Sequence, residues 1–271
     1  MKTNNNELYQ LVSKLDWQLN MGVEAMVQER HNNYPDTKKV KTDKDDLSKS
    51  EIPQKIDTSS LQEDEIQDEL LQQSLSKCLT LEELKNYMLN FNGCDLKKTA
   101  TQLVFSDGNP NSKVMLIGEA PGAEEDRQGR PFCGASGKLL DKMLASINLD
   151  RNTVYITNVI PWRPPGNRTP NENEINLMKP FLLRHIEIVE PKMLVAVGGS
   201  ASKAILDIEG GILRHRGIWK KIKLSKSLEI PIIATLHPAY LLRAPNQKRL
   251  AWEDLKSIRS KLVKLNDSSI L

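Results

Sequence analysis

Cysteine is scarce in this chain of 271 residues, and long apolar runs are missing. The three cysteines stand at positions 78, 94 and 133, an odd number without a CxxC pair, which argues against a disulfide framework and a zinc ribbon. No stretch approaches the roughly 20 uninterrupted apolar residues that span a bilayer. The N-terminal MKTNNNELYQ lacks the apolar core of a secretory signal. We therefore expect a cytoplasmic protein that makes no contact with a membrane.

The formal net charge of +3 hides an uneven distribution of charge. Residues 1–75 contain 9 Lys and Arg against 15 Asp and Glu, whereas the remaining residues contain 29 against 20. A basic body fits a polyanionic partner, because cationic side chains displace the counterions that condense on nucleic acid. A solvated basic surface explains the same charge, so the pattern leaves both interpretations open.

Three segments of different composition follow one another along the chain. Residues 1–30 carry apolar side chains at helical spacing, which predicts an amphipathic helix over about 6–28. Residues 31–75 are polar with few large apolar side chains, which is typical of a flexible linker. Residues 76–271 are expected to form a single catalytic domain.

Short apolar runs alternate with amphipathic segments from about residue 80 onward. The candidate strands are 113–118, 153–159, 192–198 and 230–236. The candidate helices are 80–90, 136–147, 172–189, 200–207 and 247–265. This alternation predicts an α/β fold of three αβα layers around a central four-stranded, mostly parallel sheet.

Chemically active residues concentrate in the loops that follow the four strands, where ligands of open α/β sheets bind. The first loop, GEAPGAEEDRQGRPFCGASGKLL (118–140), is rich in glycine and carries Glu119, Glu125 and Asp126. Carboxylates repel phosphate, so these acids favour chemistry or base recognition over a phosphate cradle. The third loop, GGSA (198–201), opens a helix whose amides can meet an anion.

Three motifs, the first loop together with TNVIPWRPPGNRTP (157–170) and HPAYLLR (237–243), occur in this order. Over residues 80–265 the chain thereby resembles the family-4 uracil-DNA glycosylases of the uracil-DNA glycosylase superfamily. The resemblance implies a monomeric repair enzyme that flips uracil out of DNA and hydrolyses its N-glycosidic bond. It would leave an abasic site for downstream repair proteins without cutting the strand.

The resemblance assigns two side chains to recognition of the base. Phe132 is implied as the stacking platform, and Asn158 as the amide that pairs with N3 and O4 of uracil. A core phenylalanine and a turn asparagine are the alternative interpretations. The implied uracil-binding residues are Gly118, Ala120, Phe132 and Asn158.

Bond cleavage leaves a uracil anion and a cationic sugar, so the site must stabilise both charges. By resemblance, His237 donates a hydrogen bond to uracil O2 as the anion forms; its alternative is a structural histidine. Glu125 is the first choice for the carboxylate that positions water, with Glu119 and Asp126 as alternates. A solvated acidic turn is the other interpretation of these three acids.

DNA contacts are expected around the same edge of the sheet. Leu242 is implied to fill the gap in the base stack and Arg243 to contact phosphate. A loop constrained by proline carries Arg163, Asn167 and Arg168 and can follow the DNA backbone. The implied DNA-binding residues are Arg163, Arg168, Ser200, Leu242 and Arg243.

The chain departs from the family at the iron–sulfur cluster, which family-4 enzymes usually hold through four cysteines. Only Cys94 remains at a ligand position, whereas Trp162 and Met178 occupy two others. One thiolate cannot hold such a cluster, so we expect neither a cluster nor any other metal. Phe91, Trp162 and Met178 are predicted to touch one another in that space, and Cys78 and Cys133 are predicted to be free buried thiols.

Two other functions remain open from the sequence. A protein of the same fold can bind uracil or abasic sites in DNA with little or no turnover. A nucleotide- or flavin-binding α/β protein is a third possibility, although acids in its phosphate loop are unfavourable.

Overall fold

A mixed six-stranded sheet organises the computed structural model, which describes residues 69–224 and 228–267. Its strand order is β1-β3-β2-β4-β6-β5. The four predicted strands are confirmed as the parallel centre: β2 (Val114–Gly118), β3 (Tyr155–Asn158), β4 (Met193–Val197) and β6 (Glu229–Thr235). The count of four strands was too low, because antiparallel β1 (Asp107–Gly108) and β5 (Trp219–Lys223) extend the two edges.

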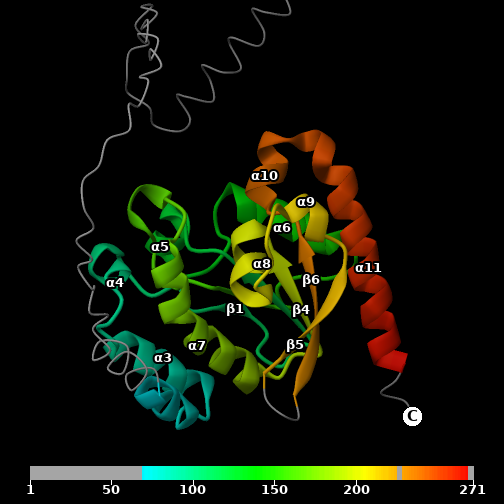
Figure 1. Cartoon of the computed structure of the whole chain (residues 1–271). Coiled ribbons are helices and arrows are strands. Elements are labelled where there is room, and N and C mark those ends of the chain that lie inside the picture. Colours follow the sequence, from blue (N-terminus) through cyan, green and yellow to red (C-terminus); the bar gives the residue numbers. More distant parts are fainter. Residues whose placement is uncertain (1–68, 225–227, 268–271) are drawn as a thin grey trace, which may run out of the picture. The chain divides into compact units, whose positions relative to one another are not determined.

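Helices cover both faces of the sheet, which confirms the three-layer αβα class (Figure 1). Neighbouring residues of β2 point to opposite faces, as strand geometry requires: Met115 and Ile117 pack in one core cluster, Val114 and Leu116 in the other. The first cluster includes side chains from α3 (Leu81–Asn90), α7 (Glu172–Val189) and α8 (Gly199–Leu206). The second includes side chains from α6 (Ala135–Ala145) and α11 (Lys248–Asp267).

The long helices begin where the sequence places N-terminal capping residues. At α3 the Thr80 side chain accepts from the Glu83 amide, and the Glu83 carboxylate accepts from the Thr80 amide. Asn171 and Glu174 form the same reciprocal pair at α7, so each box satisfies amides that the helix leaves free. The sequence did not predict the short helices α4 (Leu96–Thr99), α5 (Ala123–Gln128), η1 (Pro165–Asn167), α9 (Ile212–His215), α10 (Pro238–Arg243) and η2 (Pro245–Gln247).

The folded part includes the end of the segment predicted as a linker. Residues 69–76 are helical, and Leu75 is buried in the first core cluster. The predicted helix at 6–28 and the linker up to residue 68 lie outside the described residues. Within the described ranges, no helix is both long and apolar enough to cross a membrane.

Sheet topology places the site. The chain passes from β2 to β3 on one side and then returns to β4 on the other side of β2. The carboxyl ends of these parallel strands share one edge, and a reversal of strand order there opens the crevice in which ligands bind. Gly118, Asn158 and Gly198 stand at these ends.

A buried ion pair ties α11 to the sheet beside this edge. Asp254 on α11 is fully buried and accepts hydrogen bonds from Arg216 and from the Thr235 hydroxyl at the end of β6. Burial raises the pKa of Asp254, and the bonds from Arg216 and Thr235 act in the opposite direction. Thr235 precedes His237 by two residues, so this contact also supports the loop that carries His237.

We expect the substitution Asp254→Ala to lower the free energy of unfolding by about 3–5 kcal/mol, because it leaves the Arg216 charge buried without its partner. Urea titration followed by circular dichroism measures this change. Asp95→Ala, which removes an exposed pair with Lys98, is the matched control and should cost no more than about 1 kcal/mol. Equal effects of the two substitutions would contradict the assigned role of Asp254.

Candidate active site

The side chains of Phe132 and Asn158 come close together over Gly118, the last residue of β2. A Cβ atom placed on Gly118 would lie 2.3 Å from Asn158 Oδ1 and 2.7 Å from the ring of Phe132. Only glycine permits this approach, because real Cβ contacts are longer. The structure therefore brings together three of the predicted uracil-binding residues, and Ala120 follows on the same loop, partly buried.

The Asn158 carboxamide is available to a ligand. Asn158 is 6% exposed, yet its side chain forms no hydrogen bond with the described residues. In that part of the chain, no side-chain nitrogen or oxygen is both fully buried and unpaired, so the amide must reach solvent. A buried asparagine usually has protein partners, and this one presents its donor and acceptor outward.

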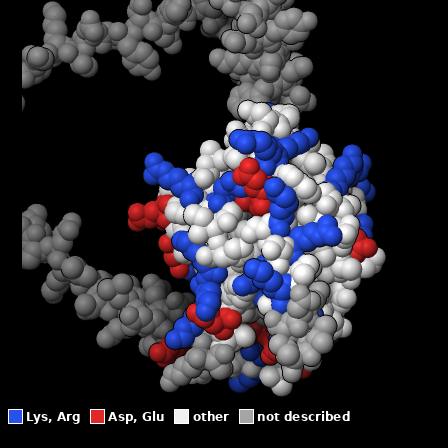
Figure 2. Space-filling model, turned by 90° about the vertical axis from the view of Figure 1, so that its right-hand side faces the viewer, with Lys and Arg blue, Asp and Glu red and all other residues white. Residues whose placement is uncertain are grey.

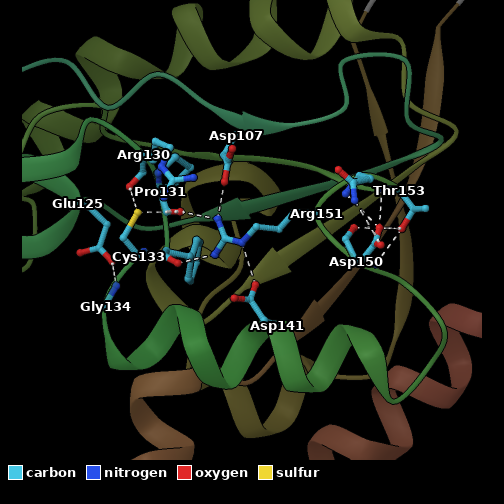
Figure 3. A network of polar contacts seen from close by, with 12 residues as sticks. Asp107, Glu125, Arg130, Pro131, Cys133, Gly134, Asp141, Asp150, Arg151 and Thr153 are labelled. Atoms are coloured by element: carbon cyan, nitrogen blue, oxygen red, sulfur yellow. Dashed lines mark hydrogen bonds and ion pairs between the residues drawn. The ribbon is translucent and has the colours of Figure 1, made fainter.

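Phe132 has an unusual backbone conformation that Arg151 holds in place. Its φ angle is +55°, a left-handed value that costs energy for a residue with a bulky side chain. The Arg151 guanidinium donates hydrogen bonds to the carbonyl oxygens of Pro131 and Phe132 and is fixed by Asp107 and Asp141 (Figure 3). Phe132 is 6% exposed and packs in the second core cluster, and its ring stacks against His237 at 5.7 Å between centroids.

Sequence reasoning missed Arg151. It lies in the turn before β3, and its partners are between 10 and 44 residues away in the chain. No local motif marks these contacts. The one signal in the sequence was a charged residue in the turn that leads into β3.

His237 is the N-cap residue of α10, and its ring is oriented by the backbone. Nδ1 accepts a hydrogen bond from the Ala239 amide at 3.1 Å. A neutral ring in this arrangement carries its hydrogen on Nε2, and Nε2 has no partner among the described residues. Gly198, with φ +99°, makes room for the ring, since a Cβ there would lie 2.9 Å from the His237 Cβ.

The environment keeps His237 uncharged. The pKa of His237 is lowered from 6.5 to about 4, chiefly by burial and also by the nearby Arg243, while Glu125 acts in the opposite direction. The ring is therefore neutral at physiological pH and can donate through Nε2 to an oxygen that gains negative charge.

Glu125 organises the first loop from within α5. One carboxylate oxygen accepts from the Gly122 amide, and the other accepts from the amides of Cys133 and Gly134 at 2.7 and 2.9 Å (Figure 3). These bonds close the loop just after Phe132. The oxygen that accepts from Gly122 keeps a further lone pair with which it can accept from water.

The other two acids have different positions. Asp126 is buried and accepts from the amide and hydroxyl of Thr101 and the amide of Gln102. It has no hydrogen bond or ring contact with Phe132, Asn158 or His237, so the structure does not bring it to them. Glu119 is partly exposed at the end of β2, and its carboxylate has no partner in the described part of the chain.

The residues predicted to contact DNA differ in exposure and in whether they already have protein partners. Leu242 is 46% exposed on α10 and Arg243 is also exposed, whereas Leu241 beside them is buried. Ser200 lies partly exposed in the first turn of α8. The other two arginines have protein partners: Arg163 bonds to Asn167, and Arg168 forms an ion pair with Glu174.

The donor residues do not fit an iron–sulfur cluster. Cys94 is buried, and burial raises the pKa of its thiol, which disfavours the thiolate that a metal requires. In the described ranges, no group of three or more His, Cys, Asp or Glu side chains can hold a metal ion. Trp162 and Met178 are buried in the same apolar cluster as Cys94, and Phe91 packs against it; direct contact among these three replacements stays a prediction.

All three thiols are free, but Cys133 differs from the prediction. Cys78 and Cys94 are buried, whereas Cys133 is partly exposed. Its thiol lies 3.0 Å from the Arg130 carbonyl oxygen.

Comparison with known proteins identifies the family of this chain. A sequence profile of the Uracil DNA glycosylase superfamily matches residues 105–256, more than half of the chain. This chain belongs to the Uracil DNA glycosylase superfamily. The matched residues include β2, β3, β4 and β6 and every predicted site residue.

Relatives within the superfamily are similar over most of the chain. A type-4 uracil-DNA glycosylase from Sulfurisphaera tokodaii is 41% identical over 188 residues, which are 66% of this chain and 84% of the relative. One from Archaeoglobus fulgidus is 38% identical over 184 residues, 66% and 92% of the two chains. A type-5 uracil-DNA glycosylase from Pyrobaculum aerophilum is 31% identical over 166 residues, 56% and 71%. The predicted resemblance to family-4 enzymes is confirmed.

We expect the His237 ring to titrate with a pKa of about 4, far below its ordinary 6.5. NMR spectra recorded from neutral to acid pH follow the imidazole signals, and a His237→Asn variant assigns the one that belongs to this residue. The nitrogen shifts should show Nε2 protonated above that pKa. A ring that titrates near 6.5, or one protonated on Nδ1, would overturn the donor assignment.

Proposed function

We propose that the protein is a uracil-DNA glycosylase, which hydrolyses the bond between uracil and deoxyribose and leaves an abasic site. The observation that carries the proposal is the open Asn158 carboxamide beside the Phe132 ring and the neutral His237. A planar base with a donor and an acceptor on one edge fits this combination. The enzyme acts on uracil-containing DNA in repair, as a monomer in the cytoplasm, and passes its product to downstream repair proteins.

The base stacks on Phe132 after it leaves the duplex. The Asn158 amide donates to uracil O4 and accepts from N3–H, a pattern that cytosine reverses. Gly118 and Ala120 line the approach, and the missing Cβ at Gly118 lets the base lie close to the strand end. Extrusion costs stacking and pairing energy, which these contacts offset.

His237 stabilises the leaving base. As the N-glycosidic bond lengthens, negative charge grows on uracil O2 and Nε2–H of the neutral ring donates to it. Because the hydrogen bond from Ala239 fixes the tautomer before the reaction starts, the site needs no reorganisation during the step.

A carboxylate on the first loop faces the sugar and positions the attacking water. Glu125 keeps this role in the proposal, since its charge already acts on His237. Glu119 is the alternate with no protein partner to displace. The bonds of Asp126 to residues 101 and 102 assign it to holding the loop.

The DNA approaches the edge of the sheet that carries these loops. Leu242 enters the base stack in place of the uracil, and Arg243 contacts a flanking phosphate. Arg163 and Ser200 contact the backbone from the loops after β3 and β4. Arg168 contributes only if its ion pair with Glu174 opens.

One feature favours a second candidate function, a protein that binds uracil or abasic sites with little turnover. Both oxygens of Glu125 already accept hydrogen bonds from backbone amides, which leaves one lone pair of the carboxylate for a water molecule. Tight binding to uracil-containing DNA with near-background cleavage would identify this function.

We expect purified protein to convert a uracil-containing oligonucleotide into an alkali-sensitive one. His237→Asn should slow this reaction about 100- to 1000-fold, since it removes one donor to a developing anion. Single-turnover assays followed by alkali and gel analysis measure the rate.

His215→Asn serves as the matched control, because His215 lies on α9 and bonds to the Glu209 carbonyl oxygen outside the site. It should leave the rate unchanged. Cleavage by wild type no faster than by the double variant His237→Asn, Asn158→Ala would reject the proposed activity.

We further propose that the protein works without an iron–sulfur cluster, because its thiols do not fit one. Protein purified without oxygen should contain far less than one cluster per chain by iron and acid-labile sulfide analysis, and should keep its full activity. Incubation with ferrous iron and sulfide should add neither visible absorbance nor activity. Stoichiometric iron and sulfide, with activity lost on chelation, would contradict this proposal.

A further inference from the structure

An open groove of about 200 Å³ lies between α6, α10 and α11, apart from the residues assigned to uracil. This volume is smaller than a site for a drug-sized ligand and suits a single planar ring system. Its walls are mainly apolar, with one exposed aromatic side chain. The lining residues are Leu139, Lys142, Met143, Ser146, Leu241, Lys248, Ala251, Trp252 and Leu255.

The groove adjoins α10, the helix proposed above to face the DNA. Leu241 on α10 is buried and forms part of its wall, and the next residue, Leu242, points outward with 46% exposure. Trp252 on α11 is 43% exposed at the groove. A large aromatic side chain at the surface is costly to leave in water and is a ready platform for a base.

The charges around the groove suit a polyanion. Lys142 and Lys248 line it, and neither forms an ion pair with a described residue. The sequence of α11 contains six Lys and Arg against three Asp and Glu, and one of these acids, Asp254, is buried with Arg216. Glu253, the acid next to Trp252, lies 4.0 Å from Arg216 and Arg249. Figure 2 looks onto the side of the molecule where α11 lies, and Lys and Arg predominate there.

We propose that this groove binds the DNA strand that flanks the flipped nucleotide. An unpaired base beside the uracil lies on Trp252, and its phosphates contact Lys142 and Lys248. The inference rests on the proposed function and adds to it a second contact on the same strand. An apolar, acidic peptide is the competing occupant, but continuity with Leu242 favours DNA.

Single-stranded binding by an aromatic platform with flanking cations has a known signature: substitution of the aromatic residue weakens binding, and each phosphate contact adds salt dependence. The test uses single strands in which uracil carries a 2′-fluoro sugar, which disfavours the sugar cation and blocks cleavage. One strand has about ten nucleotides on each side of the uracil, and two others have one flank cut to about two nucleotides. Fluorescence anisotropy gives each dissociation constant.

Trp252→Ala should weaken binding of the long strand about fivefold or more. One of the two trimmed strands, the one that no longer reaches the groove, should bind wild type and variant equally. Trp252→Phe should keep most of the wild-type affinity for the long strand. Lys142→Ala with Lys248→Ala should reduce the salt slope by about 0.7 for each phosphate contact removed.

Leu213→Ala, which removes an exposed apolar side chain on α9, is the matched control and should bind every strand as wild type does. Equal affinity of wild type and Trp252→Ala for the long strand would overturn the inference. Equal losses on all three strands would overturn it too, since they would indicate a general disturbance.

The two proposals fail in different ways. If wild type cleaves uracil strands but the groove variants show no dependence on the flank, the groove is not a DNA site and the glycosylase proposal stands. If wild type does not cleave but Trp252 still governs binding of the longer strand, the proposed activity fails and the groove contact stands.

Discussion

The absence of a side chain at Gly118 is the constraint on which the candidate site depends. Parallel strands deliver their carboxyl ends to one edge, but backbone spacing alone leaves no room for a ring and an amide over the same strand end. With only hydrogen on the Gly118 Cα, Phe132 and Asn158 occupy positions that any Cβ would block. Gly198 serves the neighbouring strand in the same way, because its positive φ and missing side chain admit His237. Two glycines thus set the spacing of three functional side chains.

Electrostatics in the site depend on a balance at His237. A histidine close to a glutamate is ordinarily stabilised as a cation, yet burial and Arg243 outweigh Glu125 here and keep the ring neutral. A neutral ring can still donate through Nε2 to an oxygen that gains negative charge. The same Arg243 that lowers the pKa of His237 is available to phosphate, so bound DNA would reduce its influence and bring the pKa of His237 upward.

Local patterns in the sequence predict the four central strands and the residues at their ends, because a buried parallel strand is apolar throughout and its end is marked by turn residues. The two edge strands were not predicted. Strand β1 has only two residues, and β5 has the sequence WKKIK, in which lysines replace the expected apolar run. Lysine is common on edge strands because its charge prevents pairing with another chain. The sequence put Glu125 before Asp126 only by resemblance, because local patterns do not show where adjacent acids point. On α5, Glu125 points toward residues 133 and 134, whereas Asp126 points toward residues 101 and 102. Arg151 could not be found from local sequence, because all its partners are distant in the chain.

The short helix α10 connects the candidate site with the groove between α6, α10 and α11. Its N-cap residue, His237, lies against Phe132, and four residues later Leu241 is buried against α6 and α11. The Leu241 amide donates to the His237 carbonyl oxygen, so the two residues share one helical turn. Asp254 joins the end of β6 to α11, the elements before and after α10 in the chain. The His237 ring and the wall of the groove therefore depend on the packing of the same short helix.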